Sequence, residues 1–517
     1  MKTIFIIIWI SFICLHSYGQ INIGGKPYSF KNEIKAKKIT KNENPKIELT
    51  ELDFDKLKKE DVYNASLGKP FRYGKAIKVA YDWNNSGEWI ELENGDRIWK
   101  LEIYCPSAKS INLTYDKFWL PKGGLLYLYD KDKKSIIGGL NERNNRGTKD
   151  NPSSYATGLI FSDKIILEYY EPKEVRCEGI ILMSYIIYGY KEINNLVQDL
   201  CTININCSPE GDNWQDEKKS VALIVSQGGV CTGSLMNNTR QDGTPYFLTA
   251  DHCLEPTGHD AISNPDASTF IFYWNYETTG CNDSIFPYYD TFPSTIGATV
   301  VANDDPSDFA LLRLTESPYD LSPQIQAYYN GWDRQIPYYG TVGIHHPMWQ
   351  PKKISTDENS PISSGTNLWK VHWDLTANGN SIVYGGSSGS PLYNIIAGRM
   401  IGQLKAVSAD SNRCDDQTAF YGKFSKSWNN GIEARRRLRD WLDPDGINYN
   451  YIDGTYCTGI RYITNTNFDV NNVIYGCTIN MQNVMVRNGA NVTFNAANDV
   501  VINGAFEVEL GSAIEIK

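Results

Sequence analysis

A turn rich in glycine and serine, YGGSSGSPLY from Tyr384 to Tyr393, contains the residue types that nucleophilic catalysis needs. A nucleophilic serine requires a base, a carboxylate that orients the base, and backbone N–H groups directed at the developing oxyanion. Glycines on both sides of Ser388 allow a tight turn whose amides converge while the hydroxyl points outward. Because glycine–serine turns are also common as plain surface turns, this stretch alone does not decide between the two.

The chain offers one histidine and one aspartate in suitable contexts. His252 ends the apolar run PYFLTADHCL, and a disulfide between Cys253 and Cys231 would fix the backbone that carries its imidazole. Asp308 begins the apolar strand of DDPSDFALLRL, where a carboxylate is tolerated only if it is hydrogen-bonded to a partner such as His252. The remaining candidates are interpreted as loop acids or structural histidines: Asp304, Asp305, His259, His345, His346 and His372.

The elements around these residues predict a mostly β protein of several domains. The chain has 517 residues, too many for one core, and its 33 tyrosines with many Asn and Gly favour strands and turns. Within GIEARRRLRDWLDP, the spacing of Ala434, Leu438, Trp441 and Leu442 predicts a helix on one apolar face. The expected segments are a signal peptide at 1–19, an exposed charged arm at 20–65, a β-sandwich at 66–195, a second strand-rich domain at 196–453, and a β-roll or solenoid-like tail at 457–517 in which strands recur every ~8 residues.

The N-terminal apolar run indicates secretion, and it is too short for a membrane anchor, which needs ~20 residues. Eleven cysteines are present, and removal of Cys14 with the signal leaves an even number that permits five disulfides. No Cys-x-x-Cys or His-Glu-x-x-His spacing occurs, so we expect no metal and no cofactor. The net charge of −10 argues against a nucleic-acid partner.

Three segments, LTADHC, SDFALL and GGSSGSP, resemble the signature segments of trypsin-like serine proteases in the same order of His, Asp and Ser. More narrowly, the chain from Cys201 to Asp453 is similar to the bacterial lysyl endopeptidases. The shared segments include CTGSLMNN, PYFLTADHC, FYWNYE, NGWDR, IHHP, GSSGSPLY, IGQL, YGKFSKSW and WLDPDG.

This resemblance implies a chymotrypsin-like double β-barrel with a C-terminal helix. It also implies a triad of His252, Asp308 and Ser388, with the amides of Gly386 and Ser388 as oxyanion hole. It makes the front domain a propeptide, removed by a cut between Lys191 and Cys201. The implied disulfides are Cys201–Cys414, Cys207–Cys281 and Cys231–Cys253, and the remaining cysteines would then pair as Cys105–Cys177 and Cys457–Cys477.

The sequence departs from the family pattern at two places. Ser387 stands where trypsin-like enzymes usually have an aspartate that receives the new N-terminal ammonium, so activation by that ion pair is not expected. In lysyl endopeptidases an aspartate at the base of the specificity pocket lies three residues before the glycine of a Tyr-Gly-Arg-like segment, and here that position is Ala419. Asp416 replaces it only if the intervening residues are an insertion, which leaves the pocket open between an acidic and an uncharged base.

The sequence therefore predicts a secreted, monomeric serine endopeptidase that acts on proteins or peptides, with Lys or Arg favoured before the cut bond. The alternatives are a protease with an uncharged pocket and a non-catalytic surface or adhesive protein on a protease scaffold. The sequence leaves open whether the tail sorts, anchors or stabilises the protein.

Overall fold

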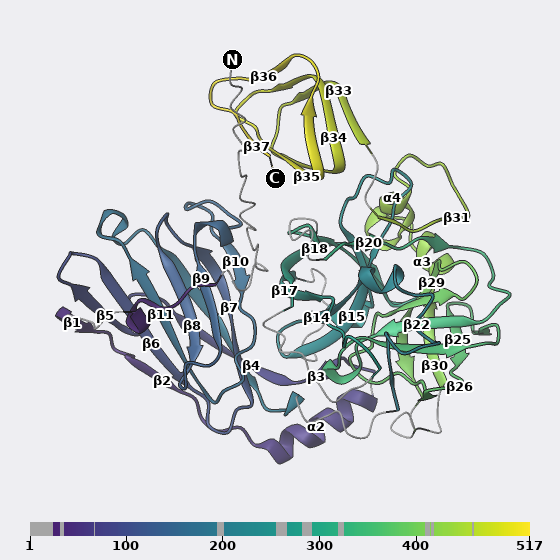
Figure 1. Ribbon diagram of the computed structural model, residues 1–517, viewed down its shortest axis with the longest axis horizontal. Helices are drawn as coiled ribbons and strands as arrows, with labels where there is room; N and C mark the ends of the chain where they lie inside the picture. Colours follow the sequence, from purple (N-terminus) through teal and green to yellow (C-terminus); the bar gives the residue numbers. More distant parts are fainter. Residues whose placement is uncertain are drawn as a thin grey trace, which may run out of the picture.

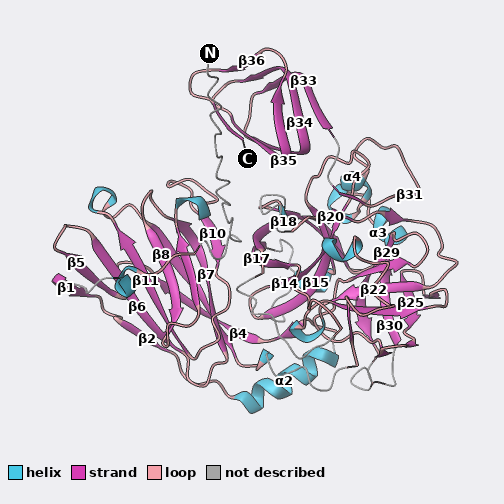
Figure 2. Cartoon of the chain, in the orientation of Figure 1, coloured by secondary structure: helices cyan, strands magenta, loops and turns pink. Residues whose placement is uncertain are grey.

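The computed structural model describes residues 24–31, 36–66, 68–193, 201–254, 266–281, 292–318, 325–408, 414, 418–456 and 460–516. The expected signal peptide lies outside these residues, as do His259, Asp416 and Cys457. Strands dominate the described chain, and its helices are few and short (Figure 2). Among the described residues, no helix has both the length and the apolar character to cross a membrane.

Two sheets built from residues 36–189 share one apolar core (Figure 1, left). The first has the order β1 (Ala36–Lys41), β5 (Glu88–Leu92), β6 (Arg97–Tyr104), β11 (Lys164–Glu171), β8 (Leu125–Asp130) and β9 (Ile136–Leu140), with β2 (Lys46–Glu48) beside β6. The second has the order β10 (Ser153–Ala156), β7 (Ser110–Trp119), β12 (Ile180–Gly189) and β4 (Gly74–Tyr81). Inward residues alternate with outward ones, as in β6, where Trp99, Leu101 and Ile103 face this core. Ile98 is buried on the opposite face, in a small cluster with Ile90 and Leu92.

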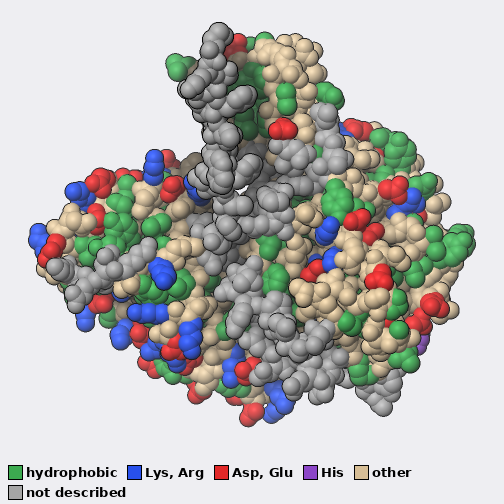
Figure 3. Space-filling view, viewed as in Figure 1, with side chains coloured by type: hydrophobic (Ala, Val, Ile, Leu, Met, Phe, Trp, Pro, Cys, Tyr) green, Lys and Arg blue, Asp and Glu red, His purple; other side chains and the backbone are tan. Residues whose placement is uncertain are grey.

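The charged segment expected as an exposed arm, residues 20–65, has regular structure, and two of its strands belong to the first sheet. Its sequence pattern did not indicate this. It contains α1 (Tyr28–Lys31), β1, β2 and α2 (Phe54–Ser66). Every residue of β1 is exposed, but its backbone pairs with β5, so strand pairing orders a sequence that has no apolar periodicity. Basic and acidic side chains are mixed over this part of the surface (Figure 3, lower left).

A closed barrel follows in the chain. Its strand order is β14 (Val221–Val225), β17 (Ala267–Trp274), β18 (Ser294–Asp304), β19 (Phe309–Leu314), β16 (Tyr246–Thr249) and β15 (Gly229–Met236), and β14 pairs with β15 to close the ring. A further short strand, β3 (Phe71–Arg72), comes from the N-terminal part of the chain and pairs with β15.

A second, ten-stranded sheet lies beside the barrel. Its order is β13 (Ile203–Asn204), β23 (Lys353–Asp357), β22 (Thr341–His345), β28 (Pro391–Asn394), β29 (Met400–Val407), β30 (Thr418–Lys423), β25 (Leu368–His372) and β24 (Ile362–Ser364), with β21 (Trp332–Asp333) and β31 (Tyr451–Ile452) at its side. Two small pairs join β20 (Tyr328–Tyr329) to β32 (Thr455–Tyr456), and β26 (Leu375–Thr376) to β27 (Gly379–Asn380). No strand pairing among the described residues closes this sheet, unlike the first barrel.

The predicted helix over GIEARRRLRDWL is wrong as a continuous element. The chain forms η9 (Ala434–Arg436) and then α4 (Arg439–Leu442), because Arg437 between them is extended. The Leu438 N–H donates to the Ser427 carbonyl of α3 (Phe424–Asn429) instead of to its own helix. Leu438 and Leu442 are nevertheless buried in one cluster with Phe424 and Trp428, and Trp441 packs against it. Ala434 is exposed, so only part of the expected apolar face is buried. The other 3₁₀ turns are η1 (Glu142–Asn144), η2 (Lys173–Val175), η4 (Glu217–Ser220), η5 (Asp251–Leu254) and η8 (Pro347–Trp349).

The tail contains longer strands than the sequence spacing suggested. They are β33 (Ile460–Phe468), β34 (Asn472–Val486), β35 (Asn491–Ile502), β36 (Phe506–Val508) and β37 (Ala513–Ile516). All their pairings are parallel, with Ile460 opposite Thr478 and Asn472 opposite Val492. They enclose a small core of their own, apart from the other clusters (Figure 1, top).

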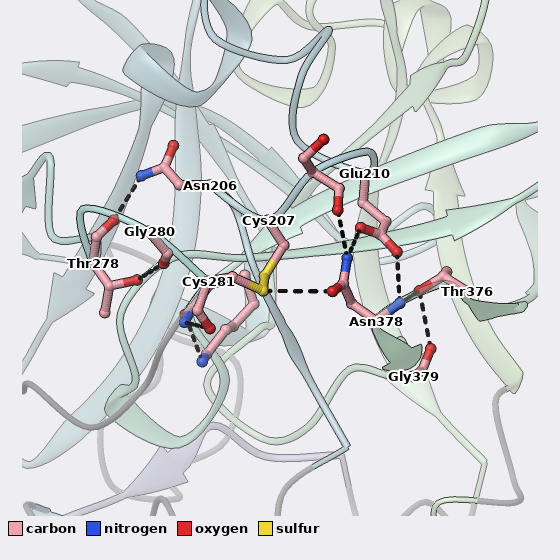
Figure 4. The surroundings of a disulfide bond; sticks show 12 residues. Asn206, Cys207, Glu210, Thr278, Gly280, Cys281, Thr376, Asn378 and Gly379 are labelled. Atoms are coloured by element: carbon pink, nitrogen blue, oxygen red, sulfur yellow. Dashed lines mark hydrogen bonds between the residues drawn. A yellow bond between two sulfur atoms is a disulfide. The ribbon is translucent and has the colours of Figure 1, made fainter.

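Three disulfides join cysteines that both lie within the described residues: Cys201–Cys414, Cys207–Cys281 and Cys231–Cys253. Around Cys207–Cys281, the Asn378 amide contacts the Cys281 sulfur and also donates to Glu210, which ties the β26–β27 hairpin to the disulfide (Figure 4). Cys477 is also disulfide-bonded, and its expected partner Cys457 lies outside the described residues.

The expected Cys105–Cys177 disulfide is wrong, since both thiols are free. Cys105 directly follows β6, whereas Cys177 lies beyond the far end of β11, which runs antiparallel to β6. A disulfide needs Cα atoms within about 7 Å, and eight residues of strand span about 26 Å. Cys177 instead contacts the Arg97 guanidinium through its sulfur.

The N-terminal sheets and the barrel meet through a shared apolar core. The largest cluster of buried side chains runs from the sheets into the barrel, where it includes Leu223, Val230 and Ile271, and it also contains Trp349 of η8. Arg146 donates to Glu316 across this interface, and both side chains are nearly buried. The N-terminal region and the barrel are thus packed as one body.

Candidate active site

His252 and Asp308 lie together at the neighbouring ends of two paired strands. Thr249 at the end of β16 lies opposite Ala310 near the start of β19, so the chain after one strand meets the chain before the other. The Nδ1 atom of His252 is 2.8 Å from Asp308 Oδ2, and the His252 N–H donates to Asp308 Oδ1 at 3.0 Å. Asp308 therefore fixes both the ring and the backbone of the histidine.

The Asp308 backbone adopts a left-handed conformation, with φ of 56°, which is uncommon for a residue other than glycine. Its carbonyl accepts hydrogen bonds from the Asp251 N–H and from Gln403 Nε2, and its own N–H donates to the Asp305 carbonyl. These bonds hold the strained turn and keep the buried carboxylate facing His252.

The interaction with Asp308 stabilises the protonated form of His252. Burial lowers the pKa of its ring, but the charge and hydrogen bond of Asp308 outweigh burial, so the net pKa lies above the ordinary value of 6.5. Lys405 nearby lowers this pKa and Asp251 raises it. Burial raises the pKa of Asp251 itself to about 6.

Ser388 is held beside this pair by its backbone. Its carbonyl accepts a hydrogen bond from the Thr232 N–H of β15 at 2.8 Å. Gly389 next to it has φ of +81°, and a Cβ there would lie 2.1 Å from Thr249 Oγ1, so only glycine allows this close approach. The hydroxyl of Ser388 makes no hydrogen bond to His252 Nε2 in this structure, and Nε2 is buried without a partner among the described residues.

The turn also presents two amides without intramolecular partners. Within the described part of the chain, neither the Gly386 N–H nor the Ser388 N–H donates to a backbone carbonyl. Gly386 has φ of +93°, and its carbonyl is turned away to accept a hydrogen bond from Thr232 Oγ1. Two free N–H groups on alternate residues of a tight turn can bind an anionic oxygen.

A buried chain of polar groups under this turn was not anticipated from the sequence, which suggested only a structural role for His345. His345 Nδ1 is 2.9 Å from Ser387 Oγ, and its Nε2 is 3.0 Å from Ser355 Oγ. Burial lowers the pKa of His345 to about 3, so the ring is neutral. Ser387 is therefore hydrogen-bonded to a neutral histidine, whereas trypsin-like enzymes have an aspartate in an ion pair at this position. The serine at this position was the sequence signal that a group other than an N-terminal ammonium must bind here.

The specificity pocket is described only in part, because Asp416 lies outside the described residues. Ala419 lies in β30 between Val371 of β25 and Val407 of β29. It is fully buried in an apolar cluster that also contains Trp369 and Tyr421. The position in register with the family's pocket aspartate is thus uncharged and apolar here.

A closed β-barrel beside a second curved sheet, with a His–Asp pair and a glycine–serine turn between them, defines a trypsin-like serine protease. Among the described residues, no group of three His, Cys, Asp or Glu side chains is placed to hold a metal ion. The arrangement offers acid–base chemistry next to a hydroxyl.

Comparison with known proteins agrees. The family described as "Lysyl endopeptidase, C-terminal domain" matches residues 198–422. The lysyl endopeptidase of Pseudomonas aeruginosa PAO1 is 25% identical over 397 residues, covering 69% of this chain and 81% of that protein. The chain is a trypsin-like serine endopeptidase related to the bacterial lysyl endopeptidases.

Solved structures of serine proteases are also similar, at low scores. A thermostable serine protease from an extremophilic microorganism is 14% identical, with a TM-score of 0.28, over 40% of this chain and 92% of that chain. The protease Anisep from Arthrobacter nicotinovorans is 16% identical, with a TM-score of 0.27, over 40% of this chain and 90% of that chain. The family match and the sequence relative carry the assignment.

Proposed function

We propose that this chain is a secreted serine endopeptidase made as a precursor, with His252, Asp308 and Ser388 as its catalytic triad. The observation that carries the proposal is the His252–Asp308 hydrogen bond beside the backbone of Ser388. The three disulfides fit an oxidising compartment outside the cytoplasm. The N-terminal region, residues 66–195, is the proposed propeptide.

In the proposed mechanism, Ser388 Oγ attacks the carbonyl carbon of a peptide bond while His252 Nε2 takes the hydroxyl proton. The tetrahedral oxyanion accepts hydrogen bonds from the Gly386 and Ser388 N–H groups. His252 then gives its proton to the leaving amine, and water hydrolyses the acyl-enzyme by the same steps. Asp308 holds the tautomer of His252 and stabilises the imidazolium.

A covalent probe tests the proposal directly. A sulfonyl fluoride or organophosphonate should form an adduct on Ser388 of the matured protein, detectable by peptide mass spectrometry. Ser388→Ala should abolish the adduct, and Ser363→Ala, at an exposed serine of β24, should leave it unchanged. If matured protein takes no label at Ser388, the non-catalytic scaffold is the correct interpretation.

We further propose cleavage after Lys or Arg, supported by the related Pseudomonas enzyme, whose name describes a lysyl endopeptidase. A buried acid at the pocket base would replace part of the hydration that the ammonium loses. The apolar packing of Ala419 favours a second candidate, a protease with an uncharged pocket.

A peptide library separates these two candidates. An acidic pocket predicts cuts almost only after Lys or Arg, and a loss of orders of magnitude in kcat/KM for Asp416→Asn but not for Asp415→Asn. A profile dominated by apolar residues, unchanged by Asp416→Asn, would establish the uncharged pocket and leave the triad intact.

A further inference from the structure

Along one edge, β15 contacts three separate segments of the chain: β3, the backbone of Ser388, and β16. Going along the strand, Gly229 lies opposite Arg72 and Val230 opposite Phe71, both in β3. Thr232 then donates to the Ser388 carbonyl, and Ser234 lies opposite Leu248 of β16. On its other edge β15 pairs with β14 from Val230 to Ser234. β3 therefore occupies the same edge as the proposed nucleophile and the strand that leads to His252.

The direction of β3 brings the N-terminal chain toward Ser388. Because β3 is antiparallel to β15, the residues before Phe71 run toward Thr232. Lys69 and Pro70 lie outside the strand, and the Lys69 N–H donates to the Asn64 carbonyl of α2 at 3.1 Å. Phe71 itself contacts that turn, since its Cβ is 3.3 Å from where a Cβ on Gly385 would lie.

The strand is fixed by contacts on both sides. The guanidinium of Arg72 donates to Asp61 of α2 at 2.8 Å, and the Tyr73 N–H donates to the Gly228 carbonyl, also at 2.8 Å. The N–H groups of Tyr190 and Lys191 both donate to the Tyr73 carbonyl, at 3.0 and 3.1 Å.

Lys191 connects β3 to the expected cleavage segment. Its ammonium pairs with Asp61 at 2.9 Å and lies 4.3 Å from the centre of the Phe71 ring. The cut that we expect between Lys191 and Cys201 would therefore begin directly beside the contacts that hold β3.

We propose that β3 is an internal inhibitor: Phe71 and Arg72 pair with β15 where an extended substrate would lie, and exclude substrate until the chain is cut and the N-terminal region leaves. Extended peptides bind exposed strand edges through backbone hydrogen bonds. β3 pairs in this way with Gly229 and Val230 of β15, so these backbone groups are not open to a substrate. The partner that fits this edge is thus an extended segment with an aromatic residue over Gly385. The inference rests on the proposed protease function.

The test compares intact and cut protein in a Ser388→Ala background, which cannot process itself. The probe is a fluorescein-labelled decapeptide with one central lysine that the matured enzyme cleaves, and its binding is measured by fluorescence anisotropy. Intact protein should bind the decapeptide at least about 10-fold more weakly than protein cut between Lys191 and Cys201 and freed of its N-terminal region, because the edge is open in only a small fraction of molecules. Equal affinities would overturn the proposal.

Two variants of the intact Ser388→Ala protein assign the effect to β3. Phe71→Asp replaces the ring beside Gly385 with a carboxylate, and Arg72→Gln removes the ion pair with Asp61, so each should strengthen decapeptide binding toward that of cut protein. Ile39→Asp is the matched control, since Ile39 is an exposed apolar residue of β1. If the intact protein binds the decapeptide weakly and neither β3 variant increases its affinity, a segment other than β3 excludes the peptide. A matured Ser388 enzyme that cleaves no peptide would refute the proposed function instead.

Discussion

At the scale of single residues, the candidate site depends on how Asp308 holds His252. One carboxylate accepts both the backbone N–H and the ring N–H of the histidine. A carboxylate that acted only as a countercharge to the imidazolium would need neither of these hydrogen bonds. The geometry therefore assigns Asp308 an orienting role, and a change that keeps its size but alters its hydrogen bonding is the informative one.

Asp308→Asn should lower kcat/KM by about 10⁴-fold with little loss of fold, because an amide cannot accept both hydrogen bonds and favours the wrong tautomer. Asp305→Asn, at an 89% exposed carboxylate of the same loop, should change kcat/KM less than twofold. Steady-state kinetics with circular dichroism checks both variants. A small effect of Asp308→Asn would mean that His252 is oriented by other groups.

The pH profile reports the charge around His252. The ring must be neutral to accept a proton, so kcat/KM should fall as the pH drops through a pKa that lies above 6.5. Lys405 lowers this pKa, so Lys405→Gln should move the acid limb to higher pH. Lys370→Gln, at an exposed lysine of β25, should leave it in place. A limb that moves to lower pH in Lys405→Gln would contradict this assignment.

At the scale of elements, two disulfides differ in what they constrain. Cys231–Cys253 joins β15, which holds Ser388, to η5, which carries His252. Cys207–Cys281 closes a longer loop, with a sequence separation of 74 against 22, and lies against the β26–β27 hairpin.

We predict that the disulfide whose loss costs less stability is the one whose loss costs more activity. Replacing Cys231 and Cys253 by alanine should cost about 3 kcal/mol of unfolding free energy, and replacing Cys207 and Cys281 about 4 kcal/mol, by the loop-entropy relation. The first pair of substitutions should nevertheless reduce kcat/KM more, since it frees the backbone of His252. Urea unfolding and kinetics on the matured proteins test this, and a larger loss of activity in the Cys207 and Cys281 variant would refute it.

At the scale of the whole molecule, the N-terminal sheets and the barrel are joined by apolar packing and by one nearly buried ion pair. Arg146 and Glu316 expose only 9% and 8% of their side chains. Breaking a buried pair leaves the remaining charge without compensation, which typically costs 3–5 kcal/mol.

Arg146→Ala should therefore weaken the association of the cut N-terminal region with the protease by about 10²–10⁴-fold. Lys149→Ala is the control, because Lys149 and Glu178 are 47% and 40% exposed and such pairs contribute at most about 1 kcal/mol. Dissociation constants of the two separated pieces give the comparison. Equal constants for the two variants would show that the Arg146–Glu316 pair does not stabilise the interface.

The sequence by itself determined the strand-rich character, the positions of His252, Asp308 and Ser388, and the three disulfides that the family resemblance implied. The strand-rich character and the candidate residues follow from local patterns: apolar strands ending in polar residues, and glycines that only a tight turn requires. The disulfide pairing came from the family resemblance. The sequence was wrong where long-range contacts decide the outcome. The helix over 434–442 is broken because Leu438 bonds to Ser427, and Cys105 and Cys177 are separated by the length of a strand pair.

Only the tertiary structure decided what lies around the site. His345, Ser355 and Ser387 are distant in the chain, and no spacing rule predicts that they form one buried row of hydrogen bonds. The pairing of β3 with β15 is equally invisible in the sequence, because two residues carry no periodicity and a strand edge accepts any extended backbone. Local pattern therefore specified the candidate triad residues, while the packing of distant segments determined what holds them and what covers them.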